Sequence, residues 1–142
     1  MKKNALFLTL LFCQMLGILQ AQQPLRIGVV GLNHDHVNWI LGRAKANDIE
    51  IVGIVEPNRA LAERHAKRRG FDMSLVYNTI EEMVEKTKPE AVTAFNSIYD
   101  HLSTVEFCAP KGIHVMVEKP LAANWKHAQR MIELAEKHKI QL

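Results

Sequence analysis

"RIGVVGLNHDHVNWI" (residues 26–40) predicts a buried strand, a tight turn and a helix, in that order. The strand ends at Gly31, and the helix is expected over residues 35–46. A glycine in this place is the first glycine of the pattern G-x-G-x-x-G, but Asn33 and His36 stand at its second and third positions. The turn is therefore either a variant of that pattern or a site with a different chemistry.

Strands and helices alternate along the rest of the chain. Short apolar runs predict strands, and the amphipathic segments between them predict helices. Because the crossover between parallel strands is right-handed, this alternation predicts an α/β fold, a doubly wound parallel sheet with helices on both faces. The expected strands are 25–30, 49–55, 90–95, 113–120 and 140–142, and the later helices are 58–69, a short one from 79, 102–109 and 124–138.

Several of these helices carry terminal signals. Asn58 and Asn124 are suited to cap the helices that follow them, and Thr79 with Glu82 has the spacing of a capping box. Gly70 is the residue type favoured just past a helix end. These signals place the helix boundaries independently of the apolar pattern.

The first 21 residues differ from the rest. Lys2 and Lys3 precede an interrupted apolar run and a small residue, which predicts a signal peptide for export to the periplasm. The run is too short and too interrupted for a membrane span. Cys13 offers a lipid anchor as a minor alternative. Residues 22–142 are then the folded domain.

Charge and cysteine content narrow the class of protein. Removal of the two leader lysines lowers the formal net charge from +3 to about +1, so the charge gives no evidence for a nucleic-acid partner, and none is expected. Cys108 is then the one remaining cysteine, so no intrachain disulfide is expected. Its place in the apolar phase of a helix predicts a packed thiol.

In a doubly wound sheet, ligands bind beyond the C-terminal ends of the strands. Four segments occupy such positions: Gly31–His36, Glu56–Arg59, Asn96–His101 and Glu118–Pro120. The first of them leads into a helix whose free N–H groups suit a pyrophosphate. We therefore assign the turn residues Gly31, Asn33, His34 and His36 to a dinucleotide.

Glu56 and Lys119 suggest the chemistry of the other strand ends. Glu56 follows Gly31 at the spacing of the carboxylate that binds an adenosine ribose, which favours NAD. Arg59 nearby leaves NADP as the alternative. A partly buried Lys119 would take or give a proton at a substrate hydroxyl, and Pro120 is suited to a cis turn.

The segments "RIGVVGLNHDH", "IVGIVEPN" and "GIHVMVEKPLA" together resemble the N-terminal Rossmann domain of the glucose-fructose oxidoreductase, inositol dehydrogenase and MocA family (Gfo/Idh/MocA). The resemblance covers about residues 25–142. It implies an NAD(P)-dependent oxidoreductase of sugars or polyols that transfers a hydride.

The resemblance also implies roles for single residues. Lys119 matches the family's active-site lysine, and Glu118 matches the neighbouring acid that contacts the cofactor region. Glu56 matches the ribose-binding acid. His101 matches the histidine of a T-P-x-x-x-H segment, in which Asn96 and Ser97 replace Thr and Pro. We assign Asn96 and His101 to the cofactor as well.

The resemblance implies a second α/β domain that binds substrate, and we expect this sequence to lack it. We therefore expect that the chain alone oxidises no polyol. Relatives often assemble through that domain, which makes a homo-oligomer through it a further expectation.

Two alternatives remain open. His34 and His36 form an H-x-H pair, as in a metal-dependent hydrolase of the barrel amidohydrolase type; the favoured interpretation assigns no residue to a metal. An exported domain that has lost two glycines could instead be a non-catalytic descendant of the fold that binds a sugar or a partner protein.

Overall fold

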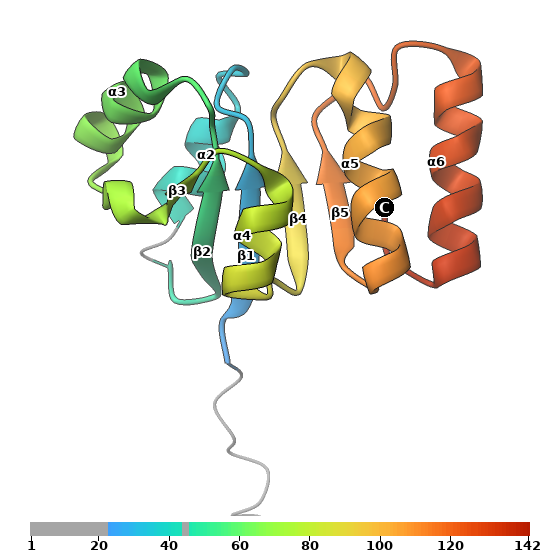
Figure 1. Ribbon diagram of the computed structural model, residues 1–142, viewed down its shortest axis with the longest axis horizontal. Coiled ribbons are helices and arrows are strands. Elements are labelled where there is room, and N and C mark those ends of the chain that lie inside the picture. The colour runs from blue at the N-terminus through green and yellow to red at the C-terminus, as the bar shows by residue number, and fades with distance from the viewer. Residues whose placement is uncertain (1–22, 44–45) are drawn as a thin grey trace, which may run out of the picture.

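The computed structural model describes residues 23–43 and 46–142, so the predicted signal peptide and Cys13 lie outside the described residues. Five parallel strands form one sheet (Figure 1). They are β1 (Leu25–Val30), β2 (Ile49–Val55), β3 (Val76–Tyr77), β4 (Ala91–Ala94) and β5 (His114–Val117).

The strand order is β3-β2-β1-β4-β5. The order reverses at β1, which pairs with β2 on one side and with β4 on the other. This is the Rossmann arrangement, whose switch point lies between β1 and β4. A barrel amidohydrolase would keep its strands in chain order, so the fold expected for the metal-hydrolase alternative is wrong.

In the described part of the chain, five α-helices cover the two faces of the sheet (Figure 1). The core is correspondingly divided into two clusters. One cluster contains Met83 of α4 (Ile80–Thr87), Val105 of α5 (His101–Cys108) and Met131 of α6 (Trp125–His138). The other contains Val37 of α2 (Val37–Arg43) and Ala62 of α3 (Arg59–Arg69).

Helix α4 lies against two strand glycines. A Cβ at Gly28 would stand 2.6 Å from Met83 Cε, and one at Gly53 would stand 2.6 Å from Met83 Cγ. Met83 itself is completely buried. The two glycines therefore let one long side chain fill the space between α4 and the sheet.

The expected helix caps are confirmed. Side-chain oxygens of Asn58, Thr79 and Asn124 accept N–H hydrogen bonds from the first turns of α3, α4 and α6. Gly70 follows α3 with φ +78°, in the left-handed region. Cys108 is also packed as expected, and its burial raises the pKa of the thiol to about 12.

Several elements differ from the expectations, and β5 ends at Val117 rather than at residue 120. Helix α2 begins at Val37 rather than at residue 35, because residues 34–37 form a turn closed by a hydrogen bond from Val37 N to the carbonyl of His34. The short β3 was not expected, since two residues show no periodicity. Residues 140–142 are not a strand, although Gln141 accepts a hydrogen bond from Val115 N and donates one to His114 Nδ1.

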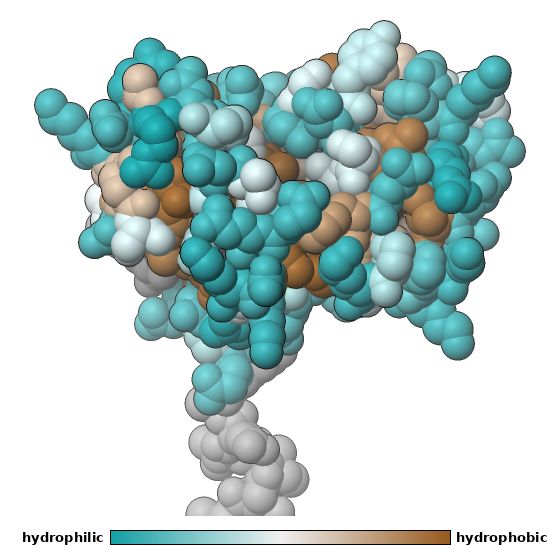
Figure 2. All heavy atoms as spheres, viewed as in Figure 1, coloured by the Kyte–Doolittle hydropathy of each residue, from teal (hydrophilic) through white to brown (hydrophobic). Residues whose placement is uncertain are grey.

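Hydrophilic side chains cover most of the face shown in Figure 2, and apolar surface appears between them in small patches. Within the described residues, every helix is too short or too polar to cross a membrane.

Candidate functional site at the carboxyl ends of the strands

A groove of about 500 Å³ lies where β1, β2 and β4 end. Four of the predicted cofactor residues line it: Gly31, Asn33, Glu56 and Asn96. The switch point of a doubly wound sheet is where such folds bind dinucleotides. The groove is therefore in the place that the topology requires.

Gly31 brings two walls of this groove together. Its φ is +80°, and an added Cβ would stand 2.6 Å from Asn96 Cα. Its N–H donates to the carbonyl of Val55 at 2.8 Å. Both the backbone conformation and the lack of space require glycine here, so the first glycine of the pattern is explained although the other two are absent.

Glu56 connects the turns that follow β1 and β2. Its side chain is only 3% exposed. One carboxylate oxygen accepts a hydrogen bond from Leu32 N at 3.0 Å, and the other accepts one from Asn58 N at 2.9 Å. A carboxylate can accept about four hydrogen bonds. Glu56 thus holds the site together and keeps capacity for a ligand hydroxyl.

Asn96 carries a buried acceptor that the protein leaves unused. Its Nδ2 donates to Thr104 Oγ1 at 3.3 Å. Its Oδ1 is buried and has no hydrogen-bond partner among the described residues. A buried polar atom without a partner costs about 1–3 kcal/mol. A bound molecule with a hydroxyl or amide donor would remove that cost.

The charge of the groove is acidic. Glu56, Glu81 and Asp100 are among its lining residues, and in the described part of the chain no lysine or arginine lines it. Arg59 is exposed at the start of α3 and is not part of the lining. Repulsion by these carboxylates disfavours the 2′-phosphate on the adenosine ribose that distinguishes NADP from NAD.

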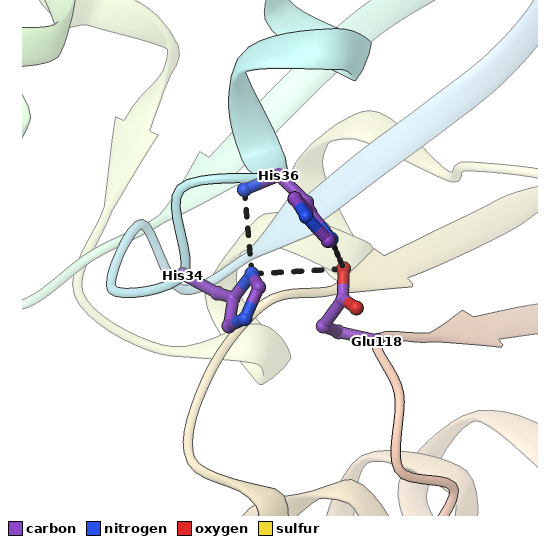
Figure 3. A group of neighbouring side chains, drawn as sticks. All are labelled: His34, His36 and Glu118. Carbon is purple, nitrogen blue, oxygen red and sulfur yellow. Dashed lines mark hydrogen bonds and ion pairs between the residues drawn. The ribbon is translucent and has the colours of Figure 1, made fainter.

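His34, His36 and Glu118 form a second cluster at the same edge of the sheet (Figure 3). The histidines come from the turn after β1, and Glu118 follows β5. His36 Nδ1 lies 2.8 Å from Glu118 Oε2, and His34 Nδ1 lies 3.7 Å from the same oxygen. Trp39 stacks on the His36 ring, with centroids 4.1 Å apart and planes at 13°.

Glu118 is a buried carboxylate held in its charged form. Burial raises its pKa, but the hydrogen bonds from His36 and from the Lys119 amide hold that pKa below its ordinary value. The Lys119 N–H donates to Glu118 Oε1 at 2.9 Å. An ionised carboxylate therefore faces two imidazoles.

Lys119 lies beside this cluster. We expected its side chain to be partly buried, but the structure leaves it exposed. Its side chain is 74% exposed, and Nζ lies 4.0 Å from Glu118 Oε1. The Lys119–Pro120 peptide is cis, as the sequence suggested. The ammonium group thus stands in solvent at the end of β5, within reach of a ligand at this edge.

His101 is in the core rather than in the groove. It is fully buried, its Nδ1 lies 3.1 Å from the carbonyl oxygen of Leu121, and its Nε2 has no partner among the described residues. Through that bond it holds the loop that follows Lys119. The structure thus places His101 beneath this loop and outside the groove lining, and its contact with a cofactor stays a prediction.

The turn after β1 uses several of its own amides. His34 N donates to the carbonyl of Phe95, His36 N donates to His34 Nδ1, and Val37 N donates to the carbonyl of His34. The groove also includes residues that sequence reasoning missed: Asn78, Ser103 and Thr104. Small polar residues before and within helices form no motif by themselves. For Asn78, only the capping role of the neighbouring Thr79 could have indicated its place in the site.

Comparisons with known proteins agree with this architecture. Residues 25–142 match the profile of the "Oxidoreductase family, NAD-binding Rossmann fold", Gfo/Idh/MocA. The rhizopine catabolism protein MocA of Rhizobium meliloti is 24% identical over 82% of this chain and 36% of its own length. The myo-inositol 2-dehydrogenase of Thermotoga maritima is 27% identical over 80% of this chain and 33% of its own length.

Solved structures show the same fold. The WlbA dehydrogenase from Bordetella pertussis, in complex with NADH and UDP-GlcNAcA, superposes with a TM-score of 0.73 at 23% identity, over 86% of this chain and 36% of that one. An oxidoreductase from Sinorhizobium meliloti gives a TM-score of 0.66 at 27% identity, over 84% and 36%. The chain spans about a third of the length of these proteins. It belongs to the Gfo/Idh/MocA oxidoreductase family, as an NAD-binding Rossmann domain.

Proposed function

We propose that the protein is an NAD-dependent oxidoreductase of sugars or polyols, and that this chain carries its cofactor site. The observation that carries the proposal is the acidic groove at the switch point, with Asn96 Oδ1 buried and unpartnered among the described residues. Sugar and polyol substrates are suggested by the printed activities of relatives, which include a D-glucoside 3-dehydrogenase and a myo-inositol 2-dehydrogenase.

The residues of the groove suit NAD. Glu56 would accept hydrogen bonds from the hydroxyls of the adenosine ribose, and Asn96 would accept one from a ribose or carboxamide donor. Gly31 and Asn33 would face the pyrophosphate. When bound, NAD supplies the acceptor for a hydride from a carbon that bears a hydroxyl group.

Lys119 is the residue at this edge that is suited to the accompanying proton. Its neutral amine would accept the proton of the substrate hydroxyl as the hydride leaves for NAD, and the resulting ammonium group would return that proton in the reverse reaction. Glu118 would limit the directions that Lys119 takes. His101 would act through the loop that it holds. The substrate itself would require groups beyond this chain, so the chain alone is expected to bind NAD without oxidising a polyol.

Calorimetric titration of NAD⁺ and NADP⁺ tests the proposal. We expect NAD⁺ to bind with a roughly micromolar Kd and NADP⁺ to bind at least about tenfold more weakly, a difference of about 1.4 kcal/mol. Glu56→Gln is expected to weaken NAD⁺ binding about tenfold, because the neutral amide is a poorer acceptor for the ribose hydroxyls. The matched control is Glu85→Gln, an exposed acid on α4 outside the groove.

A folded chain that binds neither nucleotide would refute this function. It would favour the alternative of a non-catalytic protein that binds a sugar or a partner protein. Equal loss of affinity in both variants would show that net charge, rather than the position of Glu56, governs binding. Thermal melting of each variant separates loss of the site from loss of the fold.

A further inference from the structure

We propose that His34, His36 and Glu118 bind a divalent transition-metal ion. One ligand atom from each residue lies within 4.8 Å of the other two. Two imidazoles and one carboxylate are a donor set that Zn²⁺ and Fe²⁺ use in proteins. This inference stands on the geometry of three side chains and does not depend on cofactor binding.

The distances are close to those around a shared ion. A Zn²⁺ ion with bonds of about 2.0–2.2 Å holds its ligand atoms about 3–4 Å apart. Glu118 Oε2 lies 3.7 Å from His34 Nδ1, within that range, and 2.8 Å from His36 Nδ1, so an ion between them would require His36 and Glu118 to move slightly apart. The two rings meet edge to face at 69°, so they approach the carboxylate from different directions (Figure 3).

A hydrogen bond explains the contact of Glu118 with His36 but not its approach to His34. The His36 contact is an ordinary charge-assisted bond to the carboxylate. His34 Nδ1, however, accepts the His36 N–H at 3.3 Å, so this nitrogen is a lone-pair atom 3.7 Å from a carboxylate oxygen. Two electron donors at that distance attract a cation between them. The bond given up is long for an N–H donor and therefore weak.

The surroundings already hold the ligands in place. Trp39 stacks on His36 and restricts its ring, and the Lys119 N–H fixes the second oxygen of Glu118. Such outer contacts orient ligands in metal sites. The histidine side chains are 37% and 30% exposed, so an ion has access from solvent. Three protein ligands leave a coordination position open for water or another oxygen, as in catalytic zinc sites.

Titration of the chelator-treated chain with ZnCl₂ by calorimetry tests the site, with Co²⁺ absorption in the visible range as a report on coordination. We expect one ion per chain with a roughly micromolar Kd or tighter. His34→Gln, His36→Gln and Glu118→Gln should each weaken binding at least about tenfold, since even outer-contact changes reach that size. His138→Gln, at the end of α6, is the matched control and should bind as the wild type does.

The inference is overturned if Zn²⁺ binds no tighter than millimolar, or if binding survives all three ligand substitutions. The two histidines are partly exposed and Glu118 lies at the end of a strand, so we expect each variant to fold. Thermal melting verifies this. Zn²⁺ binding without NAD⁺ binding would support the metal site and refute the proposed function, so the two proposals fail separately.

Discussion

The groove and the histidine cluster lie at the same edge of one sheet, but different features of the chain build them. The groove follows from strand order, one obligatory glycine and one buried acid, Gly31 and Glu56. The cluster depends on side chains 82 positions apart, His36 and Glu118, that meet across β1, β4 and β5. The backbone of the fold thus keeps the place of a nucleotide site, while His36, which replaces one of the two glycines, belongs to the proposed metal site beside it.

The largest effect is expected where the backbone itself builds the groove. Gly31→Ala adds a Cβ in the left-handed region and against the Asn96 backbone, and should lower the free energy of unfolding by roughly 3 kcal/mol or more. Gly112→Ala has a similar φ of +71° with no atom within 4 Å of its Cβ, and should cost only about 1 kcal/mol. Urea denaturation measures both. Equal losses would show that the close approach to Asn96 is unimportant.

An intermediate effect should come from restoring the glycine pattern. The double variant Asn33→Gly, His36→Gly frees space at the second and third positions and removes one histidine from the cluster. We expect NAD⁺ to bind about tenfold more tightly and Zn²⁺ binding to be lost, since the second glycine gives room for the pyrophosphate. Calorimetric titration with NAD⁺ and with Zn²⁺ measures the two changes in affinity. Unchanged NAD⁺ affinity would mean that Asn33 and His36 do not limit the cofactor.

The smallest effect concerns His65, on α3, which lines a separate small cavity with Leu32 and Asn33. Burial, followed by the charge of Arg68, lowers its pKa from 6.5. The unfolded chain therefore binds the proton more readily, and stability should fall as the pH drops from about 6.5 through the lowered value. His65→Gln should flatten this slope in melting curves recorded from pH 8 to 5. A slope that persists would assign the effect to other groups.

Much of this fold could be predicted from the sequence, because each feature had a local signal. The caps at Asn58, Thr79 and Asn124 and the four longer strands follow from residue type and apolar periodicity. The two-residue β3 and the hydrogen bonds of Gln141 have no such signal, since they depend on a neighbouring strand already being in place.

The candidate site was predictable only in part. Position at a strand end located Gly31, Glu56 and Asn96 in one groove. It did not show that His101 is buried beneath the Leu121 loop, nor that Glu118 faces the two histidines. Those contacts join segments far apart in the sequence, and the pairing of a particular side chain across a sheet edge leaves no trace in local pattern.

An amide-resolved NMR titration of the chain with NAD⁺ tests the central claim most directly. We predict that the amide signals that shift belong to residues lining the groove, among them Glu56, Glu81, Ser97 and Ser103. Signals from the far end of α6 should not move. Saturating NAD⁺ that leaves the groove signals unchanged in a folded chain would contradict the assignment of this edge as the nucleotide site.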